Sequence, residues 1–388
     1  MRLADRMGRL LTESAFVVLA RAKELERGGR DIIHLEIGEP DFDTPSSIVE
    51  AAYRALKEGA THYCPSQGLL ELREAICEYF ERTRGVRYSP EEVVVAAGAK
   101  PFLFYAIVAL AQSGDEVIYP NPGFPVYESV IRYAGARPVA LPILEANDFR
   151  FTVEEVRGRV NERTRLIILN YPHNPTGGTL TERELEAIAE LARERDIVVL
   201  ADEVYSNMLF EGAHVSIAAM PGMRERTILM DSHSKTYAMT GWRLGWVATN
   251  RELAAHLTKL ITNSVSCTPP FVQLAGVEAL RGPQEESGRM MEEFRRRRDL
   301  FVAGLNEVSG LSCKTPAGAF YAFPNVRKVG DCQQVAEALL EEAGVGCLAG
   351  TDFGEHGEGH IRFCFANSTE DLEKALDRIE GVVKSRLR

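Results

Sequence analysis

Chemically capable side chains stand directly after four short apolar segments of the sequence. Asn174 follows the segment LIILN, and Asp202 and Tyr205 follow IVVLA. Lys235 follows TILM, and the run Gly98-Ala99-Lys100 follows EVVVAA. Together they supply an amide, a carboxylate, a phenol, a primary amine and free backbone N–H groups. A lysine amine can hold an aldehyde as a Schiff base, and N–H groups at the start of a helix bind anions.

The apolar segments alternate with amphipathic ones between residues 46 and 280. Short runs of Val, Ile and Leu, such as 166–170 and 197–201, predict buried strands. Segment 181–194 predicts a helix, because Thr181 and Glu184 have the spacing of a capping box. Buried strands separated by helices predict an α/β fold with a mostly parallel sheet covered on both faces. Polar residues at the carboxyl ends of such strands meet at one edge, where ligands bind.

After residue 280 the sequence has the pattern of a smaller α+β domain, with long helices and short strands. Its expected strands are 311–314, 319–323 and 360–363. The N-terminal residues should pack with this domain, because the strand-like segment 32–37 precedes the first helix of the large sheet. We therefore expect a large domain at 46–280 and a small domain formed by 1–45 and 281–388.

Charge and composition exclude several classes of protein. The net charge of −11 disfavours nucleic acid as a partner. No run of 18 apolar residues exists, so no membrane span is expected, and the N-terminus lacks the apolar core of a signal peptide. The seven cysteines form no CxxC pair, which argues against a metal site and for reduced thiols in the cytoplasm. The run Arg295–Arg298 lies among glutamates and predicts a solvated helix face.

Three motifs carry a resemblance to a known family. They are HNPTG at His173–Gly177, DEVY at Asp202–Tyr205 and SHSKTYAMTGWRLGW at Ser232–Trp246. From about Ile33 to about Ala366 the chain resembles the class I/II aminotransferases, which are fold-type I enzymes dependent on pyridoxal 5'-phosphate (PLP). The resemblance implies PLP as cofactor and a ping-pong aldimine/ketimine reaction between an amino acid and a 2-oxo acid.

The resemblance also implies which residues hold the cofactor's ring. Lys235 matches the Schiff-base lysine, which also moves a proton between the substrate Cα and the cofactor. Asp202 matches the carboxylate that keeps the ring nitrogen protonated. Tyr205 and Asn174 resemble the groups that hydrogen-bond the ring oxygen. Phe124 resembles the aromatic residue that stacks on the ring.

Other matching residues would bind charged groups. The helix start at Gly98-Ala99-Lys100, with Ser232 and Arg243, resembles the phosphate site of the family. Tyr63 resembles the tyrosine that reaches the phosphate of the neighbouring subunit, which implies a homodimer with shared sites.

The substrate's α-carboxylate would be bound by Arg362 in GHIRFCFA, by the backbone of Gly38 in IGEPDF, and by Asn174. An arginine inside an apolar strand is costly unless an anion pairs with it. The segment therefore favours a binding role for Arg362 over a purely structural one.

The identity of the amino acid depends on Lys100. Segment 262–273 contains no Arg or Lys, so the partner-subunit arginine of some aspartate aminotransferases has no counterpart. Lys100 matches the lysine of a second subgroup with a GGKQ-like motif, although Pro101 replaces the usual Gln. The resemblance implies aspartate or another acidic or neutral amino acid with 2-oxoglutarate or pyruvate. Prephenate, diaminopimelate-type and alanine-type transaminases stay open.

Two other readings use the same motifs. A C–S β-lyase or an aminocyclopropane-carboxylate-type synthase would retain Lys235 and Asp202 for different chemistry. A transcription regulator with an aminotransferase-like domain would need a DNA-binding domain before the first strand, where this acidic chain has only a short segment.

Overall fold

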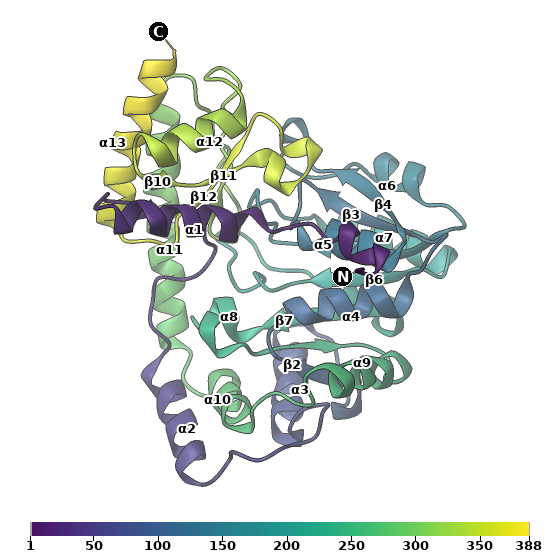
Figure 1. The fold of residues 1–388 in the computed structure, drawn as a ribbon. Helices are drawn as coiled ribbons and strands as arrows, with labels where there is room; N and C mark the ends of the chain where they lie inside the picture. The colour runs from purple at the N-terminus through teal and green to yellow at the C-terminus, as the bar shows by residue number, and fades with distance from the viewer. Residues whose placement is uncertain (1, 388) are drawn as a thin grey trace.

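The structure is a computed structural model that describes residues 2–387 and is built around one seven-stranded sheet (Figure 1). The strand order is β2-β8-β7-β6-β5-β3-β4, and β8 alone runs antiparallel to its neighbours within this sheet. The strands are β2 (Val93–Ala96), β3 (Glu116–Asn121), β4 (Arg137–Pro142), β5 (Thr164–Asn170), β6 (Val198–Asp202), β7 (Thr227–Ser232) and β8 (Gly245–Ala248). The predicted α/β fold with a mostly parallel sheet is confirmed.

Helices cover both faces of this sheet, which explains why its strands read as continuous apolar runs. In β5, Ile167 and Leu169 belong to the core on one face, and Leu166 and Ile168 to the core on the other. The first core is closed by α2 (Ser46–Lys57), α3 (Leu70–Arg84), α6 (Val153–Arg159), α7 (Glu182–Glu194) and α10 (Pro270–Arg281). The second core is closed by α4 (Lys100–Leu110), α5 (Val126–Ala134) and α9 (Arg251–Ser264).

A third core, separate from the two that cover the large sheet, lies around two small sheets. The antiparallel sheet has the order β11-β12-β9, and β1 pairs with β10 in parallel. These strands are β1 (Ile33–His34), β9 (Tyr321–Ala322), β10 (Val345–Gly346), β11 (Leu348–Ala349) and β12 (Ile361–Cys364). The helices of this part are α1 (Ser14–Arg27), α11 (Glu285–Glu307), α12 (Cys332–Glu341) and α13 (Thr369–Arg386). In Figure 1 the purple helix α1 crosses beside the yellow-green C-terminal elements, and α1 contacts β10 and β11.

Several elements differ from the sequence-based expectation. β4 was not predicted, because Pro138 and Pro142 break the strand pattern, and it tolerates them as the edge strand of the sheet. α1 was not predicted either, because only Ala22 of that helix is buried and its apolar periodicity is weak. The expected strand at 311–314 does not form. Only an isolated bridge from Ser312 to Asn325 is present there.

The expected solvated arginine face on α11 was wrong for two of its residues. Arg297 is buried and pairs with Asp41 at 2.6 Å. Arg298 is also buried, with its guanidinium carbon 4.7 Å from the centroid of the Phe210 ring. The glutamates nearby in the sequence suggested solvent, but the tertiary contacts come from distant segments. Among residues 2–387, no helix is both long and apolar enough to cross a membrane.

The sheet topology brings the polar strand ends together. β5, β6 and β7 are parallel, so Asn170, Asp202 and Ser232 end at the same edge. β2 and β7 are both antiparallel to β8, so the carboxyl end of β2 lies at that edge as well. The residues after these strands therefore face one region, as expected for an open α/β sheet.

Candidate active site

A cavity of about 780 Å³ lies at these carboxyl ends and extends to β9, β12 and the start of α1. The expected site residues that line it are Gly38, Ala99, Lys100, Phe124, Asn174, Asp202, Tyr205, Ser232, Lys235, Arg243 and Arg362. Two expected residues do not line it. Gly98 precedes the lining residue Ala99 in the chain, and Tyr63 lies on the surface between α2 and α3.

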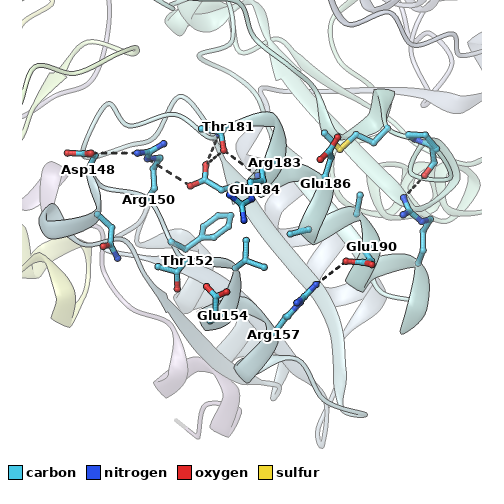
Figure 2. Close-up of a pocket in the computed structure, with 18 residues that line it drawn as sticks. Asp148, Arg150, Thr152, Glu154, Arg157, Thr181, Arg183, Glu184, Glu186 and Glu190 are labelled. Atoms are coloured by element: carbon cyan, nitrogen blue, oxygen red, sulfur yellow. Dashed lines mark hydrogen bonds and ion pairs between the residues drawn. The ribbon is translucent and has the colours of Figure 1, made fainter.

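A larger groove of about 1120 Å³ lies along α6 and α7 and does not have the features of a reaction site (Figure 2). Several of its charges pair with one another, with Arg157 3.0 Å from Glu190 and Arg150 3.9 Å from Glu184. No buried side-chain atom without a hydrogen-bond partner, among those of residues 2–387, lines this groove. Two such atoms, Asp202 Oδ1 and Arg362 Nε, belong to residues that line the smaller cavity.

Lys235 lies in α8 (His233–Thr236), one turn after the end of β7. Its Nζ donates a hydrogen bond to the main-chain oxygen of Gly38. It also lies 6.0 Å from the centroid of the Tyr205 ring and 5.6 Å from that of Phe320. Loss of hydration lowers the pKa of Lys235 to about 8, and the positive charge of Arg362 acts in the same direction. With this pKa about a tenth of the amine is neutral, and nucleophilic, at pH 7, and the neutral fraction rises as the pH approaches 8.

Asp202 is a buried carboxylate with one oxygen unsatisfied. Its Oδ2 accepts a hydrogen bond from the Tyr127 hydroxyl at 2.7 Å, whereas its buried Oδ1 has no partner within the described part of the chain, residues 2–387. Burial raises the pKa of Asp202 to about 6. A cationic N–H donor at Oδ1 would satisfy this oxygen and stabilise the charged form of the carboxylate.

Hydrogen bonds also tie the ends of β5 and β6 together. Asn170 Nδ2 donates to the main-chain oxygen of Asp202 at 3.1 Å, and the Asn174 N–H donates to Asn170 Oδ1 at 2.9 Å. The side chain of Asn170 therefore links the main chain at Asn174 to the main chain at Asp202.

The start of α4 forms a cationic cradle with Arg243. Gly98 has a φ of +94°, and a Cβ at this position would overlap the guanidinium of Arg243. A Cβ on Gly245 would overlap the backbone N of Ala99. Only glycine fits at both positions, so the chain comes close to Arg243 and leaves N–H groups free at the helix start. Ser232, the last residue of β7, lines the same region, which suits a phosphate.

Arg362 in β12 is a buried arginine without an ion-pair partner among residues 2–387. Its Nη1 donates to Asn174 Oδ1 at 3.1 Å, its Nη2 donates to the main-chain oxygen of Glu36, and its Nε has no partner. Its guanidinium carbon lies 4.5 Å from the Tyr321 ring centroid and 4.8 Å from that of Phe353. An unpaired buried cation is costly, and a bound carboxylate would remove this cost.

Tyr205 and Gly38 meet at a tyrosine that sequence reasoning missed. The hydroxyl of Tyr205 lies 2.7 Å from the hydroxyl of Tyr321 in β9. A Cβ on Gly38 would overlap the ring of Tyr321, so only glycine allows the backbone this close to Lys235. Tyr321 has no signal in the sequence, because its contact with Tyr205 spans 116 residues.

Tyr127 was missed as well, although a local signal exists. It follows Phe124 by three residues at the start of α5, and this spacing puts both on the same side of a helical turn. The two rings meet edge to face, with centroids 5.8 Å apart. Phe124 is therefore oriented by the same tyrosine that binds Asp202.

Tyr63 is 90% exposed between α2 and α3 and is remote from the cavity of its own chain. Its expected role across a subunit interface stays a prediction.

The cavity fits PLP at three points, and this fit defines the class of protein. The partly neutral amine of Lys235 suits an aldehyde, the free Oδ1 of Asp202 suits a protonated ring nitrogen, and the cradle at Ala99 and Arg243 suits a phosphate. An α/β sheet that presents these groups at its carboxyl edge is the site of a fold-type I PLP-dependent enzyme.

Comparison with known proteins gives the family. The model of the family described as aminotransferase class I and II matches residues 30–379. The chain is 42% identical to an aspartate aminotransferase of Pyrococcus horikoshii, over 94% of this chain and 93% of that protein. It is 40% identical to aromatic-amino-acid aminotransferase 2 of Thermococcus litoralis, over 94% of each chain. The solved structure of Thermus thermophilus aspartate aminotransferase with maleate superposes with a TM-score of 0.94 at 39% identity, covering 98% of this chain and all of that one.

The chain belongs to the class I and II aminotransferase family and is a PLP-dependent aminotransferase. The resemblance found in its motifs is thereby confirmed. Relatives that carry aminotransferase names across nearly the whole chain do not favour the lyase or synthase reading.

Proposed function

We propose that this enzyme transfers the amino group of an L-amino acid with an acidic or neutral side chain to 2-oxoglutarate or pyruvate in a ping-pong reaction. The observation that supports this most is the single cavity in which Lys235, Asp202 and Arg362 come together from separate segments. Similar proteins named for aspartate and for aromatic amino acids are consistent with this range of donors.

Four cavity residues would act directly on the cofactor and the substrate. Bound PLP supplies an electron-withdrawing ring that stabilises negative charge at the substrate Cα. Lys235 holds the cofactor's aldehyde and, once released, moves a proton to and from the substrate Cα. Asp202 holds the proton on the ring nitrogen. Arg362 and Asn174 bind and orient the substrate's α-carboxylate, assisted by the backbone of Gly38.

The remaining cavity residues position the cofactor. Ala99, next to Gly98, supplies N–H groups to the phosphate, together with Ser232 and Arg243. Tyr205 would donate to the ring oxygen, and Phe124 would pack against the ring. Ser232 ends β7 and Ala99 precedes α4 directly, so the phosphate region is positioned by the fold itself.

The half-reaction tests this function. Holoenzyme mixed with one L-amino acid and no acceptor should yield one 2-oxo acid per active site and convert the cofactor to its amine form, which absorbance can follow. Addition of 2-oxoglutarate or pyruvate should reverse the conversion. Release of ammonia, or of pyruvate with sulfide from a sulfur amino acid, would contradict the proposal.

The lowered pKa of Lys235 predicts how fast the cofactor-free protein captures PLP at different pH. Below pH 8 the amine is mostly protonated and therefore unreactive, and above pH 8 the neutral amine dominates. The rate of PLP capture should therefore rise with pH, with a midpoint near pH 8. An ordinary lysine, with a pKa of 10.5, would show a much higher midpoint. Stopped-flow absorbance measures the rate, with Lys235→Ala protein as the blank. A midpoint above pH 10 would be inconsistent with the cavity described.

We also propose that the enzyme is a homodimer in the cytoplasm, with a large domain at 46–280 and a small domain from 1–45 and 281–388. The 90% exposure of Tyr63 supports the dimer, because a tyrosine of the family's phosphate site should be covered in the assembly. The separate core around the small sheets, with β1 paired to β10, supports the division into domains.

The dimer makes a specific prediction for mixed subunits. Tyr63→Ala and Lys235→Ala homodimers should both be impaired. Hybrid dimers of the two should recover one working site, which combines Lys235 of one chain with Tyr63 of the other. The activity of purified hybrids, compared with each parent, measures this. If the hybrids are no more active than the Tyr63→Ala parent, Tyr63 does not act across the interface.

A further inference from the structure

Lys100 forms an ion pair with a carboxylate of its own chain. It is the first residue of α4, and its Nζ donates to Glu13 Oε2 at 2.7 Å. Glu13 immediately precedes α1, and 87 residues separate it from Lys100. The same ammonium lies 5.6 Å from the centroid of the Phe16 ring and 5.1 Å from that of Phe124. One carboxylate and two aromatic faces therefore already surround this positive charge.

The wall around this pair is apolar. Ala15, Phe16 and Leu19 of α1 line the cavity together with Glu13. Phe16 is 58% exposed, an unusual fraction for a phenylalanine unless something else covers it. A second lysine that lines the cavity, Lys23 of α1, is also paired, with its Nζ 2.8 Å from Glu26. This end of the cavity therefore presents apolar surface next to a neutralised ion pair.

The same cavity also holds the groups that act on the substrate's backbone. Arg362 suits the α-carboxylate, and Lys235 is the reacting amine. A bound amino acid with its backbone between these two must place its side chain in the rest of the cavity, whose lining includes Glu13, Phe16 and Lys100. The charges there then decide which side chains are accepted.

We infer that Glu13 is a specificity-determining residue, which holds Lys100 in an ion pair so that the cavity prefers L-amino acids with uncharged, above all aromatic, side chains over dicarboxylic ones. This inference rests on the proposed function. A dicarboxylic substrate can pair with Lys100 only if the Glu13–Lys100 ion pair breaks. Its distal carboxylate then lies close to the Glu13 carboxylate, and the two negative charges repel each other. An aromatic side chain packs on Phe16 and leaves the pair intact.

The test compares two analogues that cannot react, succinate and 3-phenylpropanoate, by calorimetric titration of the holoenzyme. The wild-type enzyme should bind 3-phenylpropanoate more tightly. In Glu13→Gln, which keeps the size of the side chain and removes its charge, the Kd for succinate should fall about fivefold, the range of a partly exposed ion pair. The Kd for 3-phenylpropanoate should stay within about twofold, because its binding does not need Lys100 to be free.

Kinetics should follow the same pattern. In the half-reaction, Glu13→Gln should raise kcat/KM for L-aspartate relative to L-phenylalanine by about the same factor of five. Glu24→Gln is the matched control, since Glu24 lies on α1, the helix that Glu13 precedes, has a side chain 62% exposed and pairs with Arg21. The control should change neither the binding nor the kinetic ratio.

Three results would overturn the inference. They are tighter binding of succinate than of 3-phenylpropanoate by the wild-type enzyme, an unchanged succinate Kd in Glu13→Gln, and an equal change for both analogues, which a merely structural role would produce. The first result needs no variant, so the inference is testable even if Glu13→Gln folds poorly. Failure of both amino acids to react in the wild-type half-reaction would instead count against the proposed function, because calorimetric binding does not depend on turnover.

Discussion

Replacing Lys235 with alanine should lower kcat for transamination by about 10⁴-fold or more, because general acid–base catalysis alone contributes up to about 10⁴-fold. The variant loses both the covalent attachment of the cofactor and the group that moves the proton at Cα. The main measurement is the single-turnover half-reaction. A small primary amine added to the solution should restore part of the rate, because the lysine acts through its amino group.

The matched control for this variant is Lys259→Ala. Lys259 is an exposed lysine on α9, remote from the cavity. Its removal should leave the half-reaction and the cofactor absorbance unchanged. A Lys235→Ala enzyme with more than about a tenth of the wild-type rate would mean that another group carries the proton, since a positioned base contributes at least about 10²-fold.

Replacing Asp202 with asparagine should lower kcat by about 10²- to 10³-fold, since loss of one partner of a buried, hydrogen-bonded charge pair costs about 2–5 kcal/mol. Asparagine has nearly the same shape as aspartate, so the bond from Tyr127 and the packing of β6 can persist. The amide bears no charge, and it can turn its NH₂ group toward the ring nitrogen, which disfavours the protonated ring. The half-reaction rate and the Kd of the cofactor should both worsen.

Asp196→Asn provides the control for charge removal at an aspartate. Its side chain is 95% exposed and pairs only at the surface with Arg226. This change should leave kcat and cofactor affinity within about twofold, as surface ion pairs contribute little. A similar effect in Asp196→Asn and Asp202→Asn would show that the loss comes from general destabilisation and not from the ring nitrogen.

The strand-end residues could be predicted from the sequence because each follows its strand directly. Asp202 ends one apolar run, and Lys235 comes one helical turn after another, so the run itself indicates where the side chain lies. The parallel order of the sheet then brings these positions to one edge without any further information. The positions of these groups are for this reason readable from local patterns, whereas their roles at the cofactor followed from the resemblance to the family.

Several residues that enter the site from distant segments could not be predicted from local patterns. Tyr321 reaches Tyr205 across 116 residues, and Glu13 reaches Lys100 across 87. Neither lies in a pattern that indicates its partner, and α1 itself lacks a clear apolar stripe. The buried Arg297 shows the same limit, since its partner Asp41 lies on a segment far away in sequence. Local patterns predict elements and their ends, whereas the substrate side-chain region depends on how separate elements pack.

The most direct test of the account is to locate the cofactor on the chain. Holoenzyme treated with borohydride fixes the lysine-bound cofactor as a stable secondary amine, and mass spectrometry of the digested protein identifies the modified residue. We expect one PLP adduct per chain, on Lys235. An adduct on another lysine, or none on a protein that still transaminates, would contradict the central role assigned to Lys235.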